Sequence, residues 1–271
     1  MRDSDEQGFL VLRKKIFRER GLDLSQYREK CLKRRIDVRL RTTGVHNYLE
    51  YMAVLKKDPS EYDRLFDALT INVTNFFRDK NTYRVIEKTV IPELISSKKR
   101  KGKRIIRVWS AACASGEEPY SMAILFHEIL GERIGDYLIS IYATDIDEKV
   151  MEKAKRAEYE AGTFSEVDAK ILRRYFNRNL KYSLKEEIKK MVRFKRHDLI
   201  SDRPLAHLDI ILCRNVLIYF SRDLQIRLFD KFYVALNRDG YLILGKTESL
   251  AGESAGLFQP VSIRERIYRK K

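Results

Sequence analysis

Two adjacent carboxylates, Glu117 and Glu118, end a segment of small residues at positions 110–116, and Pro119 follows them. The apolar run at 105–108 before this segment is typical of a buried strand. Pro119 favours the first turn of a helix, where its missing N–H costs nothing, and the apolar residues after it recur at helical spacing. The sequence therefore predicts a strand, a tight turn and a helix, an arrangement that lets a cofactor approach the backbone closely.

The residues of this turn differ from those of a phosphate-binding turn. It contains a single glycine, Gly116, and its two acids stand where a phosphate would otherwise rest on the helix N-terminus. Carboxylates at that place repel a pyrophosphate and attract a cation. S-adenosylmethionine fits this requirement because it carries an ammonium and a sulfonium but no phosphate. The alternative interpretation is that the two acids only stabilise the start of the helix through its dipole.

Acidic residues also follow the predicted strand at 138–143, where Asp145 and Asp147 come next. In nucleotide-binding α/β folds, an acid at the tip of this strand accepts hydrogen bonds from the ribose hydroxyls. Asp145 is the candidate for that role, because Asp147 can cap the helix predicted over 147–157. Capping by Asp145 itself is the alternative.

A third acid, Asp198, lies with Leu199 shortly after the apolar stretch at 192–194. A polar side chain beside an apolar one suits an adenine, which offers an amino group for a hydrogen bond and a ring for packing. An ordinary acid in a turn is the alternative interpretation.

Two arginines also stand where they could take part in chemistry. Arg214 follows the predicted buried strand at 208–213, where a charged side chain needs a partner because an unpaired buried charge is expensive. Arg78 ends the cluster 72–78, in which two aromatic residues stand beside it. On spacing alone, packed aromatic rings with an extended arginine are the simpler interpretation of that cluster. The four histidines have no metal-ligand spacing, so the sequence predicts no metal site.

These candidate residues need a scaffold, and the pattern of the chain predicts one. From residue 105 onward, strand patterns alternate with helical ones, which predicts an α/β fold with a parallel sheet. The predicted strands of that sheet are 105–108, 138–143, 208–213 and 240–245. Short apolar stretches at 182–184 and 191–194 predict a small antiparallel insertion, and the alternation over 258–268 predicts an edge hairpin.

The beginning of the chain has a different pattern. Apolar residues recur there at helical spacing, and no strand pattern occurs before about residue 104. We therefore expect an all-helical N-terminal domain at 1–80, a linker at 81–103 and an α/β domain at 104–271. The small β-subdomain is expected within the last of these, at about 180–195.

The composition indicates which kinds of partner and which cellular compartment to expect. The chain has 271 residues and a net charge of +16, which indicates an acidic partner without choosing among nucleic acid, an anionic membrane and an acidic protein surface. Its three widely spaced cysteines favour a reducing intracellular compartment. The polar N-terminus has no signal-peptide core, and no apolar run is long enough to span a membrane. We therefore expect a cytoplasmic protein.

Four blocks of the sequence together resemble the chemotaxis receptor methyltransferases, the CheR family. The blocks are 70–78, 107–121, 143–147 and 213–220, and they occur in the family's order over nearly the whole chain. The resemblance implies a small helical domain and a Rossmann-like S-adenosylmethionine-dependent methyltransferase domain with a small inserted antiparallel β-subdomain. The implied activity is protein-glutamate O-methyltransfer in chemotaxis adaptation: glutamate side chains of chemoreceptors become γ-methyl esters, with S-adenosylhomocysteine as product.

The resemblance also implies roles for individual residues. Arg78 and Tyr219 would be catalytic, Glu118 would hold the methionine ammonium with Glu117 beside it, and Asp145 would bind the ribose. Asp198 and Leu199 would frame the adenine, although Asp198 stands where the family's asparagine is expected. The full set that would contact the cofactor is Asn72, Thr74, Arg78, Glu118, Asp145, Asp198, Leu199, Arg214 and Asn215.

A glutamate substrate agrees with the residue types present. Its side chain has a pKa of about 4.3 and is already a nucleophile at neutral pH, so no general base is required. The enzyme then needs chiefly proximity and orientation. Arg78 could grip the substrate carboxylate through its planar fork, and Tyr219 could position it by a hydrogen bond.

The expected partner is the cytoplasmic helical domain of chemoreceptors, bound by a monomer without membrane insertion or nucleic acid. The basic run 33–35, with Arg39 and Arg41, matches the helix that would face this partner. On a helical wheel Arg34 and Arg41 lie opposite apolar residues, so a solvated face is the alternative. Family members that dock on a receptor tail carry glycine in a β-subdomain loop; residues 179–190 have none, which disfavours that mode.

The sequence disfavours two other classes of function. The basic charge favours a nucleic-acid methyltransferase, but enzymes that methylate base amino groups usually carry an Asn/Asp-Pro-Pro-aromatic motif after the fourth strand. Residues 214–217 contain no proline. A receptor-binding scaffold without activity is disfavoured by the intact Asn72, Arg78, Glu118 and Asp145.

Overall fold

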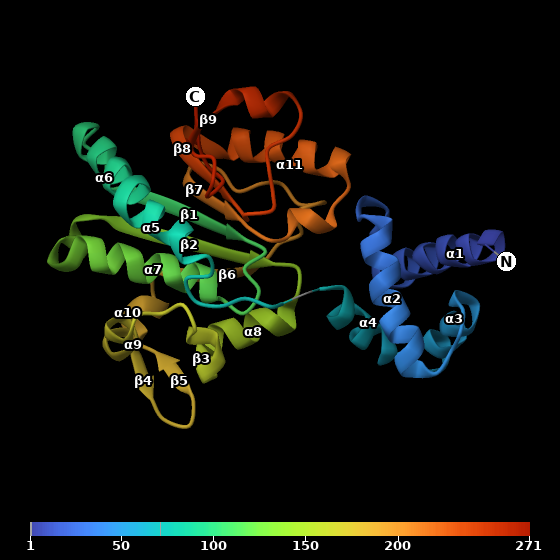
Figure 1. The fold of residues 1–271 in the computed structure, drawn as a ribbon. Coiled ribbons are helices and arrows are strands. Elements are labelled where there is room, and N and C mark those ends of the chain that lie inside the picture. The colour runs from blue at the N-terminus through green and yellow to red at the C-terminus, as the bar shows by residue number, and fades with distance from the viewer. Residues whose placement is uncertain (1, 71) are drawn as a thin grey trace. The chain divides into compact units, whose positions relative to one another are not determined.

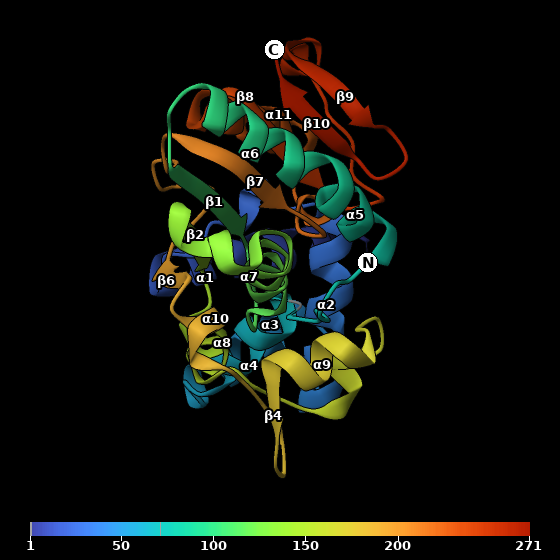
Figure 2. The ribbon, with the colours of Figure 1, turned by 90° about the vertical axis from the view of Figure 1, so that its left-hand side faces the viewer.

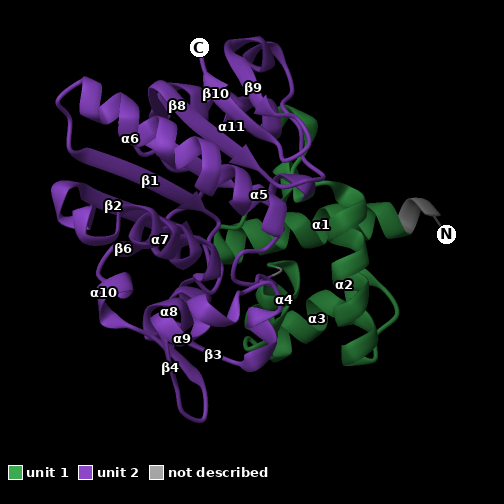
Figure 3. Ribbon diagram, turned by 60° about the vertical axis from the view of Figure 1, so that its left-hand side comes forward, with its two compact units in different colours: residues 1–71, 219–224 green, residues 72–218, 225–271 purple. Residues whose placement is uncertain are grey.

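The computed structural model describes residues 2–70 and 72–271 and divides the chain into two compact units (Figures 1 and 3). The first unit comprises residues 1–71 together with Tyr219–Leu224, and the second comprises Asn72–Ile218 with Gln225–Lys271. The sequence pattern predicts a helical domain up to residue 80 and a linker at 81–103, whereas residues 72–103 all fall in the second unit.

The first unit is helical in its described part. Its helices bury one apolar face each, for example Phe9, Leu12 and Ile16 of the first helix. Gly44 ends α2 with a φ of 74°, a left-handed conformation that glycine adopts without strain. The elements are α1 (Arg2–Arg20), the 3₁₀ turn η1 (Leu24–Gln26), α2 (Glu29–Thr43), α3 (Tyr48–Lys57) and α4 (Glu61–Leu69).

A later piece of the chain completes this unit. Phe220 forms an antiparallel bridge with Tyr27, and their rings meet edge to face at 5.1 Å. The backbone N–H of Arg28 donates to the carbonyl oxygen of Tyr219 at 2.8 Å. Sequence patterns could not reveal this contact, because the two residues of the bridge lie far apart in the chain.

The second unit is built on a seven-stranded sheet within the described residues, in the order β6-β2-β1-β7-β8-β10-β9. Pairing is parallel from β6 to β8, and β10 and β9 continue the sheet as an antiparallel hairpin. The strands are β1 (Ile105–Ala111), β2 (Leu138–Asp145), β6 (Val192–Arg196), β7 (Leu208–Cys213), β8 (Leu236–Leu244), β9 (Phe258–Ser262) and β10 (Ile267–Lys270). The predicted α/β class and C-terminal hairpin are therefore confirmed.

Helices cover both faces of this sheet. Val108 of β1 lies in one core cluster with side chains of α7 (Glu117–Leu130), whereas its neighbour Trp109 meets Phe232 of α11 (Arg222–Ala235) edge to face at 5.7 Å. Successive side chains of a strand point to opposite faces, so α7 and α11 lie on opposite sides of β1. The other helices and turns after β1 are η3 (Gly131–Asp136), α8 (Glu148–Arg156), η4 (Ala161–Phe164), α9 (Ala169–Tyr175), α10 (Glu186–Lys189), η5 (Leu217–Tyr219) and η6 (Glu253–Leu257).

The stretch expected as a linker is mostly helical. It forms α5 (Lys80–Val85), the π-helical turn η2 (Ile86–Val90) and α6 (Ile91–Arg100). Ile86, Val90, Ile91 and Leu94 are buried in the same core cluster as α7, and this packing explains why the segment orders as a helix.

A small antiparallel sheet lies beside the main one, as expected, but its strands differ from the prediction. It has the order β3-β5-β4, formed by Glu158–Tyr159, Tyr182–Leu184 and Phe176–Arg178. The hairpin of β4 and β5 extends away from the rest of its unit (Figure 2). The stretch 191–194, expected in this small sheet, is instead the start of β6 in the main sheet, where Val192 and Phe194 pair with Ile141 and Ala143 of β2.

Candidate functional site

The candidate site lies at the carboxyl ends of β2, β1 and β7. The sheet order reverses here, since β1 has β2 on one side and β7 on the other. Open α/β sheets bind ligands in the crevice outside the carboxyl ends of the strands at such a switch point. The loop after β1 and the residues Asp145 and Arg214 all follow these strand ends.

The loop between β1 and α7 has an unusual backbone. Ala112, Ala114 and Gly116 have φ angles of 60°, 48° and 94°. A Cβ on Gly116 would lie 3.0 Å from Cβ of Ala154 and 3.3 Å from Cζ of Phe194. Both the backbone angle and the tight space therefore require glycine here, and the loop packs closely against α8 and β6.

Asp145 holds this loop in place. One carboxylate oxygen accepts from the backbone N–H of Ala114 at 2.9 Å, and the other accepts from the N–H of Asp147 at 3.0 Å. Burial raises the pKa of the Asp145 carboxyl, and these backbone donors oppose the increase. A carboxylate can accept about four hydrogen bonds, so the two described here leave capacity for ribose hydroxyls.

Asp147 has the capping role that the sequence predicts for it. Its Oδ1 accepts from the N–H of Val150 at the start of α8, and its Oδ2 accepts from the side-chain amide of Asn72 at 2.9 Å. Asn72 is thereby tied to the end of β2, beside Asp145. Thr74, further along the same segment, is half-buried.

Glu117 and Glu118 are both buried at the start of α7. Ser115 Oγ donates to the Glu117 carboxylate at 2.7 Å, and Ser110 Oγ donates to Glu118 at 2.8 Å. Burial raises the pKa of Glu117 to about 7 and also raises the pKa of Glu118, although the charge of Arg214 opposes the second increase. Two buried carboxylates of this kind gain from a bound cation, which would lower both pKa values.

Arg214 is buried and joins this acid pair to another segment. Its Nη1 lies 3.3 Å from Glu118 Oε2, and its Nη2 donates to Asp79 at 2.7 Å and to the carbonyl oxygen of Arg78 at 2.8 Å. Its Nε is buried and has no hydrogen-bond partner among the described residues. The charge partner that a buried Arg214 requires is therefore a pair of carboxylates, Glu118 and Asp79. Asp79 was not among the residues predicted from the sequence.

The turn that carries Arg78 is fixed from several sides. The N–H of Phe77 donates to Ser121 Oγ of α7 at 2.9 Å, and the N–H groups of Asp79 and Lys80 donate to Glu166 at 3.1 and 2.8 Å. Phe77 and Asp79 have φ angles of 55° and 66°. The guanidinium of Arg78 donates only to the carbonyl oxygen of Val73 among the contacts described and is half-buried.

Asp198 and Leu199 lie in a compact loop after β6. Both Asp198 oxygens accept hydrogen bonds within this loop, from the N–H of Ile200 and from Ser201 Oγ, each at 2.8 Å. The ammonium of Lys231 on α11 donates to the carbonyl oxygens of Leu199, Ile200 and Asp202. Asp198 therefore stabilises this loop, which agrees with the alternative interpretation of an ordinary acid in a turn. Its contact with an adenine stays a prediction.

Asn215 begins the loop after β7 with a φ of 60°. Its N–H donates to Glu248 at 3.0 Å, and the same buried carboxylate accepts from the N–H groups of Gly245, Leu217 and Ile218. A Cβ on Gly245 would lie 2.7 Å from Glu248 Oε2, so the close approach requires glycine. Glu248 is a second organising residue that sequence reasoning missed.

Tyr219 belongs to the first unit. The guanidinium of Arg35 on α2 lies over its ring, 5.1 Å from the centroid. Arg78 belongs to the second unit, so the predicted cooperation of these two residues stays a prediction.

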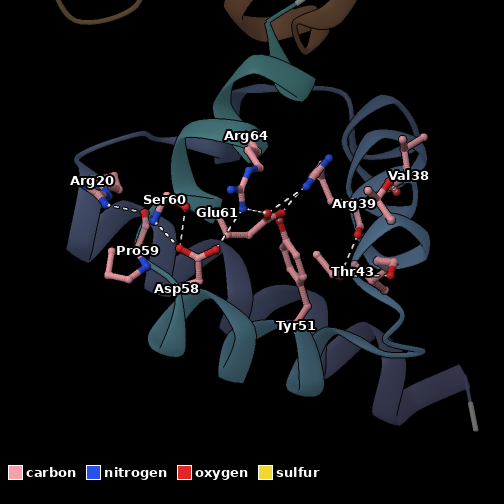
Figure 4. Close-up of polar contacts among 12 residues, drawn as sticks. Arg20, Val38, Arg39, Thr43, Tyr51, Asp58, Pro59, Ser60, Glu61 and Arg64 are labelled. Atoms are coloured by element: carbon pink, nitrogen blue, oxygen red, sulfur yellow. Dashed lines mark hydrogen bonds and ion pairs between the residues drawn. The ribbon is translucent and has the colours of Figure 1, made fainter.

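The basic residues of α2 are used in different ways. Arg39 forms two hydrogen bonds of 2.9 Å with the buried Glu61, which also accepts from the hydroxyl of Tyr51 (Figure 4). Arg35 donates to the carbonyl oxygen of Ala68 at 2.9 Å. Arg34 and Arg41 are exposed, so they are the members of this basic set that remain available to a partner.

The residues at the carboxyl ends of β1, β2 and β7 fit S-adenosylmethionine. Its ammonium would find two buried carboxylates, its ribose would find Asp145, and its own carboxylate would find the unused Nε of Arg214. The three carboxylates among these groups disfavour a pyrophosphate. No helix in the described part of the chain is long and apolar enough to cross a membrane.

Comparison with known proteins agrees with this geometry. Residues 72–267 match the family model described as "CheR methyltransferase, SAM binding domain", and residues 7–70 match "CheR methyltransferase, all-alpha domain". A "Chemotaxis protein methyltransferase" of Listeria innocua is 37% identical over 90% of this chain and 91% of its own length. One of Borreliella burgdorferi is 31% identical over 92% and 89%. The chain therefore belongs to the CheR methyltransferase family, and S-adenosylmethionine is its methyl donor.

Proposed function

We propose that this protein methylates specific glutamate side chains of chemoreceptors and forms γ-glutamyl methyl esters. Its relatives are named chemotaxis protein methyltransferases, which supports a substrate within the chemotaxis system. The buried acids of the site and the arginine-bearing turn beside them support the specific reaction.

We propose that the residues near the carboxyl ends of β1, β2 and β7 bind the cofactor. Glu118, with Glu117 beside it, would hold the ammonium, Asp145 would bind the ribose, and Asp198 with Leu199 would frame the adenine. Arg214 would hold the carboxylate of the methionine part. Asn72, Thr74 and Asn215 would line the site around these groups.

Glutamate as acceptor requires little from the protein beyond orientation. When bound, the cofactor supplies an electrophilic methyl group, and an ionised glutamate is already the nucleophile near neutral pH. Arg78 would grip one or both oxygens of that carboxylate and aim it, and Tyr219 would position it by a hydrogen bond. No general base is needed in this scheme.

One observation carries the proposal: the guanidinium of Arg214 contacts Glu118 and also donates to the main-chain carbonyl oxygen of Arg78. The positive charge of Arg78 also acts on Glu118 and lowers the pKa of that carboxyl, against the larger effect of burial. A residue so linked to the acid that would hold the cofactor is well situated to orient the acceptor.

The partner proposed is the helical cytoplasmic domain of a chemoreceptor. A substrate that presents several glutamates is anionic, and the net charge of +16 favours its approach. The exposed Arg34 and Arg41 are the proposed contacts on α2. The enzyme is proposed to act in the cytoplasm as a monomer.

A labelling experiment tests this function. Membranes that contain chemoreceptors are incubated with the full-length protein and methyl-labelled S-adenosylmethionine. We expect label on the receptor band that mild base releases as methanol, because carboxylate esters hydrolyse under those conditions. Glu118→Gln serves as the matched control with reduced labelling. Base-stable label on protein, or label on nucleic acid, would contradict the proposal.

A further inference from the structure

A recess of about 400 Å³ lies in the second unit, at the amino ends of the parallel strands of the main sheet. Its walls come from α6 and the turn before β1, from the start of β7, from the first half of β8 and from β10. The candidate methyltransfer site lies at the carboxyl ends of the same parallel strands. The recess is therefore a separate feature, and the proposed function does not use it.

Cationic side chains outnumber carboxylates in this recess by six to three. The cationic ones are Lys98, Arg100, Lys101, Lys103, Arg238 and Arg269. They include most of the basic residues in the run 98–104 before the first strand, and the methyltransfer site does not use them.

All three carboxylates already have partners within the recess. Asp209 forms a 2.8 Å ion pair with Lys98, and both side chains are largely buried. Asp239 pairs with Arg269 at 2.9 Å and with Lys101 at 3.2 Å. The third, Glu93, accepts from the hydroxyl of Tyr241 at 2.7 Å. The two aspartates neutralise neighbouring cations, whereas Glu93 has a hydroxyl partner, and an excess of positive charge remains in the recess.

Three of the cations have no carboxylate partner among the described residues. They are Arg100, Lys103 and Arg238, all of them exposed, and Arg100 donates to Ser96 Oγ at 2.8 Å. Ion pairs within the recess therefore do not account for them.

Arg269 supplies an independent observation. Its Nη2 is bonded to Asp239, but its Nε is buried and has no hydrogen-bond partner among the residues described. An unsatisfied buried donor is unfavourable, and an acceptor from a ligand would remove that cost.

We propose that this recess binds a small anion that carries two or more phosphate groups. Phosphate oxygens match the fork of an arginine guanidinium and the point charge of a lysine. The volume falls within the range of about 300–1,000 Å³ that is usual for small-molecule sites. Such a ligand would bridge the three unpaired cations and accept from Arg269 Nε.

The test is a calorimetric titration of the full-length protein at low ionic strength with pyrophosphate, ATP and inorganic phosphate in separate runs. Lys103→Ala with Arg238→Ala removes two unpaired cations and breaks no described ion pair. Loss of charged hydrogen bonds should weaken binding of pyrophosphate and ATP about 10- to 100-fold. Lys56→Ala with Lys57→Ala, a pair of exposed lysines at the end of α3, is the matched control and should bind normally.

Arg269→Lys tests the orphaned donor, since it keeps the charge beside Asp239 but removes Nε. It should also weaken the binding of pyrophosphate. Affinity for S-adenosylmethionine should stay unchanged in every variant and shows that each is folded. The proposal is overturned if neither pyrophosphate nor ATP binds, or if the control pair loses binding equally. Equal, weak binding of inorganic phosphate and pyrophosphate would likewise overturn it.

Discussion

The guanidinium of Arg214 holds the main chain of Arg78, with Nη2 2.8 Å from the Arg78 carbonyl oxygen. The same guanidinium contacts Glu118, whose carboxylate would hold the cofactor's ammonium. Arg214 thus couples the turn that carries Arg78, the proposed holder of the substrate carboxylate, to the acid of the cofactor site.

Arg214→Met should lower the free energy of unfolding by about 3–5 kcal/mol, because it leaves the carboxylates of Glu118 and Asp79 without their buried partner. Urea unfolding, followed by circular dichroism, measures this effect. Adding Glu118→Gln to the same chain should recover part of the loss, since one of the unpaired charges is then removed. An Arg214→Met protein with unchanged stability would show that the ion pairs contribute nothing.

Glu118→Gln and Asp145→Asn should each weaken the binding of S-adenosylmethionine by about 1–3 kcal/mol, the usual effect of losing a charged hydrogen bond. Isothermal titration with S-adenosylmethionine and S-adenosylhomocysteine provides the measurement. Glu148→Gln on the exposed start of α8 is the control and should bind normally. Normal affinity in both site variants would remove them from the cofactor site.

Arg78→Ala should reduce turnover far more than it reduces cofactor affinity, because its proposed partner is the substrate carboxylate. Arg78→Lys should rescue turnover only in part, since an ammonium lacks the planar fork. Steady-state kcat and the cofactor Kd separate the two effects. Wild-type turnover in Arg78→Ala would show that Arg78 only packs beside Phe76 and Phe77 and does not hold the substrate.

Cofactor binding should release a proton near pH 7. The pKa of Glu117 is raised to about 7 by burial, so this side chain is partly protonated in the free protein, and a bound ammonium favours its ionised form. Affinity should therefore rise with pH up to about 7 and then level off. Titration in buffers of different ionisation enthalpy counts the protons released, and Glu117→Gln should abolish the release.

The same shift predicts how Glu117 affects stability. The raised pKa means that the folded state favours the neutral carboxyl, so its contribution is fully present below the unfolded value of 4.5 and is lost as pH rises toward 7. A Glu117→Gln protein should therefore lose less stability than the wild type between these two pH values.

Reversal of Arg34 and Arg41 to Glu should raise the apparent receptor KM and leave the cofactor Kd unchanged. These two exposed arginines can steer an acidic partner, and the rate for the wild type should fall as ionic strength rises. Arg35 and Arg39 are left intact because they hold contacts within the first unit. Reversal of Lys56 and Lys57 is the control, and an equal effect there would indicate steering by total charge alone.

Local patterns predicted the parts of the site that lie on one strand, turn and helix. Gly116 and the Glu117–Glu118 pair were found because small residues and acids stand between a strand pattern and a helix pattern. Asp145 and Asp147 were separated correctly into a strand-end acid and a helix cap by their order in the chain.

Contacts between distant segments could not be predicted in this way. Glu166 holds the turn of Arg78 across 86 or 87 positions, and Asp79 meets Arg214 across 135. The pairing of Arg39 with Glu61 depends on how α2 and α4 pack, which a helical wheel of α2 does not contain. The strand at 192–196 was assigned to the wrong sheet because a short apolar stretch does not reveal its pairing partner.

Mass-spectrometric mapping of the methylated residue tests the central claim most directly. The receptor's cytoplasmic domain is incubated with the full-length protein and S-adenosylmethionine, digested and sequenced. We predict methyl groups on the γ-carboxylates of particular glutamates, loss of each modification when that glutamate is replaced by glutamine, and little modification by Arg78→Ala. Methyl groups on lysine, arginine or cysteine side chains, or modification that persists after the glutamates are replaced, would contradict the account.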